Sequence, residues 1–311
     1  MSENLIEWLK LLLLALVQGF TEILPISSSG HILVLENLMG LNTSLTFSVF
    51  LHLGSLLAVF IFFHREIKNL CLSFFSYIFK KNREEQTTKN FHFIILLMIA
   101  TIPAGTIGVL FNDVIDQIFY RPIFVILGFY ITALLLFLIR YTKIKRTIEQ
   151  MTWKDALYVG LAQAIGIIPG ISRSGITISA LKSKNLDDDS VAHFSFFMLM
   201  PVTLGSFIVE VIKVLKTPLE SIKTSILPIS VCVIVSLIAT YISLHLFLKL
   251  IKKRETMVFF PLFNYFSYLI NFLIKVKALT NLSAYFLYSS VGVSAISSSS
   301  SGAKTAIEEI S

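Results

Sequence analysis

The sequence predicts an all-α polytopic membrane protein, a helical bundle of two inverted-topology repeats that each contain a broken re-entrant helix hairpin. Hydrophobic residues fill 55% of the 311 positions and charged residues only 14%, whereas soluble domains carry about a quarter charged residues. Many apolar runs approach the roughly 20 residues that cross a bilayer. The net charge of +7 fits basic membrane-protein loops, and basic and aromatic residues do not interleave as they do in nucleic-acid binding.

Five stretches are predicted to span the membrane because each is apolar over almost the required length. They are Leu45–Phe63, Phe91–Phe111, Pro122–Ile139, Val191–Leu215 and Ile226–Ile251, with Met257–Ile274 as a weaker sixth. Two further apolar stretches, 5–24 and 156–170, run into Pro/Gly/Ser breaks followed by short segments at 31–41 and 174–184. Each pair is predicted to form a re-entrant hairpin, since broken backbone at membrane depth needs surrounding protein or a water-filled cavity.

Loop charges predict the orientation. Loops 64–90, 140–155 and 249–254 are rich in Lys and Arg, which places them in the cytoplasm. The first hairpin then enters from outside and the second from the cytoplasm, as an inverted repeat would produce.

Matching residues at an offset of 145 support such a repeat: Trp8 with Trp153, Gln18 with Gln163, and Gly30 with Gly175. Further on, the stretch from Phe47 to Phe50 resembles that from Phe194 to Phe197 after an insertion of two residues. The membrane domain is predicted to cover 1–279, with repeats at about 5–139 and 150–274. The serine-rich tail 280–311 cannot bury a core and is predicted to be disordered.

The first break places polar groups inside apolar sequence: Gln18, Glu22, Ser27, Ser28, Ser29, Gly30 and His31. Polar residues at such depth are costly, which indicates function. Gln18 and Glu22 lie one helical turn apart, so their oxygens can hold a hard divalent cation together with substrate phosphate. The alternative is a membrane-edge glutamate paired with a basic side chain.

The serine run supports more than one interpretation. Ser28 with His31 three residues later could form a nucleophile and base pair. His31 could equally be a general acid for a leaving group. The structural alternative is a serine N-cap that begins the next helix.

The second break, from Pro169 to Gly175, repeats the first with Arg173 in place of Ser28. Its glycines let the backbone approach a ligand, and the helix start that follows offers unpaired amides, which favours an anion site. The Arg173 guanidinium suits a pair of phosphate oxygens. An arginine that extends to the membrane surface is the alternative.

Other polar residues are interpreted as structural. His52 and His193 lie alone beside apolar segments. Asp187, Asp188 and Asp189 resemble a metal cluster but precede a helix, whose N-terminus acidic residues stabilise.

The two breaks resemble the motifs of the undecaprenyl-diphosphate phosphatase family of bacterial membranes, the bacitracin-resistance phosphatases. The resemblance covers about 5–255, and its matching residues are Gln18, Glu22, Pro25, Ser27, Ser28, Gly30, His31, Pro169, Gly170, Ser172, Arg173, Ser174 and Gly175. It implies hydrolysis of undecaprenyl diphosphate to the monophosphate and inorganic phosphate with Mg²⁺ or Ca²⁺. It also implies a multi-pass plasma-membrane protein with its active site facing outside, which recycles the lipid carrier of the cell wall and confers bacitracin resistance.

The resemblance also implies roles for individual residues. Glu22 with Gln18 would serve the metal and the diphosphate, and Arg173 would clamp phosphate. Ser28 would be the nucleophile or position water, and His31 would be the acid/base. Further phosphate-binding positions would be Ser27, Ser29, Gly30, Gly170, Ser172, Ser174 and Gly175.

The partners implied are a polyprenyl diphosphate and membrane lipids but no nucleic acid, and a homodimer is an open alternative. Two departures from the family are Gln18, where many members have glutamate, and the stretch from Phe263 to Phe266, which lacks an arginine. The residues alone also allow a transporter or flippase of a phosphorylated lipid or other anion.

Overall fold

The structure is a computed structural model that describes residues 3–252 except 42, 44, 120–121, 140–141, 143–145 and 217–225. The described residues are all-helical and contain no strand, only an isolated bridge between Arg146 and Leu186. The predicted helix Met257–Ile274 and the tail 280–311 lie outside the described residues.

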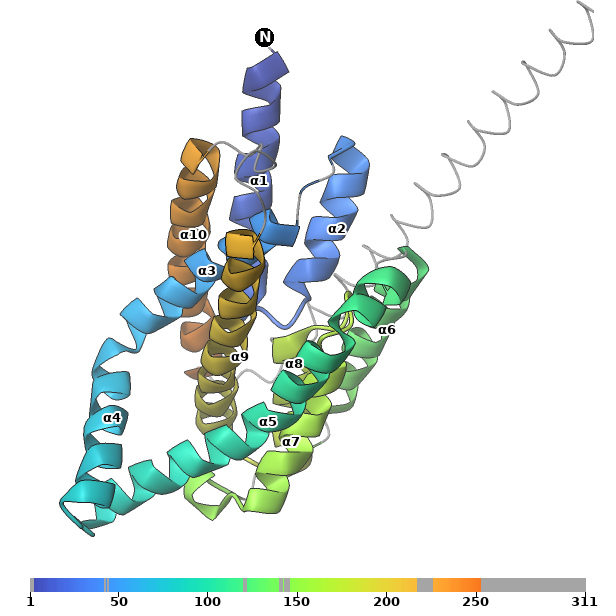
Figure 1. Cartoon of the computed structure of the whole chain (residues 1–311). Coiled ribbons are helices and arrows are strands. Elements are labelled where there is room, and N and C mark those ends of the chain that lie inside the picture. The colour runs from blue at the N-terminus through green and yellow to red at the C-terminus, as the bar shows by residue number, and fades with distance from the viewer. Residues whose placement is uncertain are drawn as a thin grey trace, which may run out of the picture. The chain divides into compact units, whose positions relative to one another are not determined.

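The described helices follow the predicted order (Figure 1). They are α1 (Glu3–Ile23), α2 (Ser28–Met39), α3 (Leu45–Phe62), α4 (His64–Phe79), α5 (Glu85–Phe119), α6 (Pro122–Leu138), the short 3₁₀ helix η2 (Ile148–Gln150), α7 (Trp153–Ile165), α8 (Arg173–Ser183), α9 (Asp188–Lys216) and α10 (Ile226–Lys252). Each predicted span within the described residues, and each half of the two predicted hairpins, coincides with one of them.

The prediction of a loop over 64–90 is wrong. Most of this interval is helical, because α4 occupies His64–Phe79 and α5 already begins at Glu85. α3 bends by 75° where it meets α4. Basic residues in the first half of α4 and directly after its end concealed its apolar part. Leu72 and Phe79 in that part are 58% and 74% exposed.

Three helices among the described residues contain stretches long and apolar enough to cross a membrane: Glu85–Phe111, Asp188–Val209 and Leu227–Lys249. The bent pair α3–α4 adds a fourth if it counts as one span, and α6 is apolar but shorter. The chain is therefore a multi-pass membrane protein.

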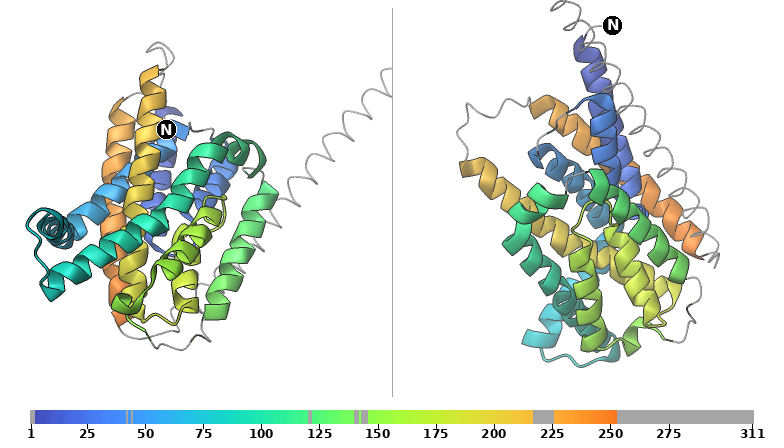
Figure 2. Two further views of the ribbon diagram at one scale, coloured as in Figure 1. Left: turned by 60° about the horizontal axis from the view of Figure 1, so that its bottom comes forward. Right: turned by 90° about the vertical axis from the view of Figure 1, so that its right-hand side faces the viewer.

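Close helix packing depends on two glycines (Figures 1 and 2). α10 lies against α1, where a Cβ on Gly19 would come within 2.5 Å of the Ser236 carbonyl oxygen. α7 lies against α5, where a Cβ on Gly160 would collide with the Ala100 backbone. Small residues let helix backbones approach closely in membranes, so these contacts fix how α1 and α7 are held against their neighbours.

Charged groups stabilise the starts of α7 and α9. Asp155 accepts hydrogen bonds from Arg146 (2.8 Å) and Thr152 (2.9 Å). Burial raises the pKa of Asp155, but these hydrogen bonds outweigh it and hold the pKa below its ordinary value. Asp187 accepts a hydrogen bond from the Ser190 amide at 2.9 Å, so it caps α9. This confirms the structural interpretation for Asp187, and Asp188 forms an ion pair with Lys182 at 2.5 Å.

Candidate active site

The two helix breaks meet inside the bundle. One break lies between α1 and α2 and the other between α7 and α8. Ser174 donates a hydrogen bond to the Leu24 carbonyl at 3.1 Å. A Cβ on Gly30 would lie 3.1 Å from Gly170 Cα. The polar motifs, about 145 residues apart in sequence, are therefore neighbours in space.

Two of the predicted serines act as helix caps. Ser27 accepts a hydrogen bond from the Gly30 amide at 3.3 Å, and Ser172 accepts one from the Gly175 amide at 3.0 Å. Ser27 has φ 66°, a conformation that residues with a Cβ rarely adopt. Gly170 has φ 90° and lies against the Val125 backbone, where no side chain would fit. The structural interpretation of the serine run thus holds for Ser27, and Ser172 plays the same part in the second break.

Glu22 is the centre of the cluster. Its side chain is only 3% exposed, and its Oε1 lies 2.7 Å from Arg173 Nη2. Its Oε2 accepts hydrogen bonds from Ser28 Oγ at 2.5 Å and from Gln18 Nε2 at 2.9 Å. The alternative interpretation, in which Glu22 pairs with a basic side chain, is therefore confirmed. The basic side chain is Arg173, which belongs to the second break. Arg173 also donates to Thr203 Oγ1 at 3.2 Å.

His52 joins this cluster, which the sequence did not predict. Its Nδ1 lies 2.7 Å from Gln18 Nε2 and 3.2 Å from Glu22 Oε2. His52 Nδ1 therefore lies within reach of both the Gln18 amide and the Glu22 carboxylate. His52 comes from α3, and no motif near it in the sequence marks the position. His193, by contrast, pairs with Glu66 at 2.6 Å, as a structural histidine would.

His31 is buried, and its Nδ1 lies 2.7 Å from the Ser27 carbonyl oxygen. A carbonyl only accepts, so Nδ1 carries the proton and Nε2 is the ring nitrogen that would exchange a proton with a substrate. The Phe129 ring meets the His31 ring edge-on at 5.3 Å. The Ser28 hydroxyl donates a hydrogen bond to Glu22. Glu22 is therefore the group placed to act as a base toward Ser28.

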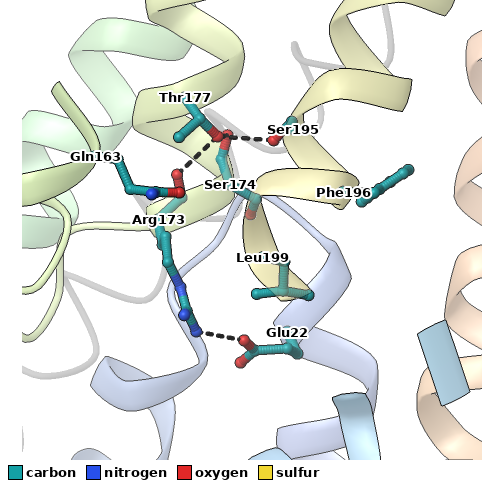
Figure 3. Close-up of a pocket in the computed structure, with 8 residues that line it drawn as sticks. All are labelled: Glu22, Gln163, Arg173, Ser174, Thr177, Ser195, Phe196 and Leu199. Carbon is teal, nitrogen blue, oxygen red and sulfur yellow. Dashed lines mark hydrogen bonds and ion pairs between the residues drawn. The ribbon is translucent and has the colours of Figure 1, made fainter. Parts of the chain in front are cut away.

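A small pocket opens beside the ion pair (Figure 3). Figure 3 shows Arg173 reaching from the start of α8 to Glu22, with Gln163 near the base of the arginine side chain. Hydroxyls and apolar side chains complete the lining, which consists of Glu22, Gln163, Arg173, Ser174, Thr177, Ser195, Phe196 and Leu199. The guanidinium, the hydroxyl groups and the amide suit an anionic ligand that displaces the Glu22 carboxylate, which also lines the pocket, from Arg173.

The residues fit a metal that is shared with a substrate. Within the described part of the chain, no group of three His, Cys, Asp or Glu side chains could hold a metal ion. The donors near Glu22 are one carboxylate, the Gln18 amide and the Ser28 hydroxyl. Mg²⁺ sites in phosphoryl transfer commonly use one or two carboxylates and complete the shell with substrate phosphate and water. The donor set therefore suits a metal site that substrate phosphate and water complete, and does not suit a site whose ligands all come from the protein.

Known proteins resemble the chain over most of its length. The sequence profile of the family described as bacitracin resistance protein BacA matches residues 11–269. Undecaprenyl-diphosphatase 3 of Bacillus anthracis is 41% identical over 252 residues, which cover 81% of this chain and 92% of that protein. Undecaprenyl-diphosphatase of Oceanobacillus iheyensis is 37% identical over 249 residues, 79% of this chain and 89% of that protein. The chain belongs to the bacitracin resistance protein BacA family.

Proposed function

We propose that this protein is an undecaprenyl-diphosphatase, which hydrolyses undecaprenyl diphosphate to undecaprenyl phosphate and inorganic phosphate. The observation that carries the proposal is the 2.7 Å contact between Glu22 and Arg173 at a buried pocket of a multi-pass membrane protein. Relatives 37% to 41% identical carry the name of this enzyme. The reaction recycles the lipid carrier of peptidoglycan synthesis and confers bacitracin resistance.

Arg173 is the phosphate clamp in this proposal. Its guanidinium is held by Glu22 and Thr203, so it is fixed in position before substrate arrives. Two oxygens of the terminal phosphoryl group would compete with Glu22 for the guanidinium. Positioning and charge stabilisation supply most of the catalysis in phosphoryl transfer, and a fixed planar fork provides both.

Glu22 and Gln18 would then hold a divalent cation, Mg²⁺ or Ca²⁺, with the diphosphate oxygens. Such a cation neutralises charge that builds up on the transferred group. When phosphate binds and displaces Glu22 from Arg173, Glu22 Oε1 becomes available to bind the cation. Binding of substrate and cation would therefore be coupled through Glu22.

Ser28 and His31 would perform the proton chemistry. Ser28 Oγ donates a hydrogen bond to Glu22 Oε2 at 2.5 Å. This supports a serine oxygen, or a water in its place, as the attacking group, with Glu22 taking up its proton. In its doubly protonated form, His31 would give its Nε2 proton to the departing lipid phosphate oxygen, while Nδ1–H stays on the Ser27 carbonyl. The capping serines Ser27 and Ser172 shape the two helix starts, and Ser174 lines the pocket. Ser29, Gly30, Gly170 and Gly175 are proposed to bind phosphate through the backbone at these starts.

The same chain is proposed to contain two inverted repeats with re-entrant hairpins. In Figure 1, α1 descends to its break and α2 returns upward, whereas α7 starts at the lower end. The packing supports two interlocked repeats. α10 of the second repeat lies against α1 of the first, and α5 of the first lies against α7 of the second. α4 and the start of α7, near the basic segments, lie at the end opposite the N-terminus. Since the basic segments are assigned to the cytoplasm, the end that carries the N-terminus would face outside. This supports an active site that opens to the outer side.

Labelling tests the orientation in a background with Cys71 and Cys232 replaced. A cysteine at Glu149 should escape an impermeant thiol reagent on intact cells, while a cysteine at Asn37, which is exposed near the end of α2, should react. Labelling of position 149 would reverse the assignment.

A transporter of phosphorylated lipid is the second candidate, because inverted repeats also serve transporters. The names of the relatives do not favour it. Phosphate release from undecaprenyl diphosphate by detergent-purified protein separates the two, since a transporter leaves the anhydride bond intact.

A further inference from the structure

Gln163 has an unusual place in the second motif. The residue is 1% exposed, and its side-chain nitrogen Nε2 has no hydrogen-bond partner among the described residues. Buried donors are almost always paired in native proteins, because leaving one unpaired costs free energy. An amide kept at this position is therefore expected to meet an acceptor from outside the chain.

The repeat explains why the partners are absent. Gln18, the counterpart of Gln163 in the first motif, donates to Glu22 at 2.9 Å and contacts His52 at 2.7 Å. At the offset that aligns the motifs, Ile167 stands where Glu22 does. With the two-residue insertion, Leu199 stands where His52 does. The second half has kept the amide and replaced both of its polar partners by hydrocarbon.

The surroundings select the kind of acceptor. Gln163 and Arg173 line the same pocket (Figure 3). The other hydrogen-bonding side chains of that pocket are already engaged: Glu22 with Arg173, Ser174 with the Leu24 carbonyl, and Thr177 with Ser195. A guanidinium and an unpaired N–H facing one space favour an anionic oxygen. A phosphoryl oxygen meets that requirement.

We infer that Gln163 binds substrate, with Nε2 donating a hydrogen bond to a non-bridging phosphoryl oxygen of the diphosphate that Arg173 clamps. The inference rests on the proposed function and adds a residue to its binding site. It assigns the two equivalent glutamines different tasks. Gln18 donates to Glu22 and would help it hold the cation, whereas Gln163 contacts the anion.

Stability and kinetics together test this assignment. The variants are Gln163→Met, which keeps the side-chain volume and removes the amide, and the smaller Gln163→Ala. Gln86→Met is the matched control, because Gln86 is exposed and bonds only to Asn90 among the described contacts. Initial rates of phosphate release from undecaprenyl diphosphate and thermal unfolding in detergent are measured for each protein.

Gln163→Met should unfold at or above the wild-type temperature, since it replaces an unpaired buried donor by a thioether. Its kcat/KM should fall about tenfold to a hundredfold, the value of one hydrogen bond to a charged acceptor, with a raised KM. Gln163→Ala should lose kcat/KM to a similar extent, and Gln86→Met should match wild type in both measurements.

Three results would overturn the inference. Wild-type kcat/KM in folded Gln163→Met would show that the amide does not touch substrate. Failure of both Gln163 variants to fold would assign the amide a structural task. Absence of phosphate release from the wild-type protein would refute the proposed function, and this inference with it. Normal wild-type turnover together with an unaffected Gln163→Met would refute the inference alone.

Discussion

Glu22 and Arg173 lie 151 positions apart in the chain, and their side chains meet at 2.7 Å between Oε1 and Nη2. Each comes from the edge of a helix break: Glu22 from the last turn of α1 and Arg173 from the first turn of α8. The contact joins the two halves of the molecule at their most polar point. It explains why both breaks carry polar residues in otherwise apolar sequence.

Glu22→Gln should lower stability and abolish most activity. The change leaves the Arg173 charge without its carboxylate, and breaking a buried pair costs about 3 kcal/mol. Loss of the group that receives the Ser28 proton should lower kcat at least about 100-fold. Thermal unfolding and phosphate release measure the two effects.

Glu66→Gln is the control for that experiment. Glu66 is half exposed and pairs with His193 at the surface, where such pairs contribute at most about 1 kcal/mol. It should keep wild-type turnover. Equal losses in both variants would contradict a special position for Glu22.

Metal removal should stop turnover, and Gln18→Glu should change the metal dependence. A second carboxylate beside Glu22 adds a ligand for Mg²⁺ or Ca²⁺. Without metal, the same change sets two negative charges where Gln18 Nε2 now donates at 2.9 Å, so it should lower the unfolding temperature. Titration of Mg²⁺ into chelator-treated protein should show half-maximal activity at a lower concentration for Gln18→Glu. Full activity of the wild type in excess chelator would refute the metal proposal.

His31→Ala should lower kcat by about 10² to 10⁴, because it removes a proton-transfer group. The loss should be smaller with a substrate analogue whose leaving group needs no protonation. His245→Ala serves as a comparison, because the ring of His245 packs against Phe62 and Tyr241 outside the pocket. If both analogue and natural substrate suffer equally in His31→Ala, His31 has a structural task and not the role of general acid.

The close approach of α7 to α5 gives a stability prediction. Gly160→Ala places a Cβ against the Ala100 backbone, and such overpacking costs about 1–3 kcal/mol. Gly105→Ala, on the same helix as Ala100, adds a Cβ that meets nothing within 4 Å. It should be neutral or stabilising by up to about 1 kcal/mol. Unfolding temperatures of the two variants that fall equally would argue against the helix contact.

The sequence predicted the parts of the site that depend on local chemistry. Buried polar residues indicated a cation site at the first break and an anion site at the second, and the structure brings Glu22 and Arg173 together. The capping of α2 and α8 by Ser27 and Ser172 follows from the ordinary preference of serine for helix starts. These features require only a few neighbouring residues, so they can be read from the chain.

The rest depends on tertiary packing that no short stretch encodes. His52 reaches Glu22 because α3 lies against α1, and its own neighbours are apolar residues with no motif. Thr203, which holds Arg173, lies on α9 for the same reason. The helix α4 was missed because the charges at its ends resemble those of a loop. Whether the Gln163 amide is paired depends on residues from other helices, so the sequence could not predict it.

Arg173→Lys tests most directly the claim that the Glu22–Arg173 contact marks a phosphate clamp. The substitution keeps the charge but replaces a planar fork by a point charge. Loss of one charge-assisted hydrogen bond costs about 2–3 kcal/mol, so phosphate release from undecaprenyl diphosphate should fall roughly 30- to 150-fold in a protein that still unfolds cooperatively. Arg83→Lys, a surface change beside Tyr77, should leave the rate unchanged. Wild-type turnover by folded Arg173→Lys would contradict the account.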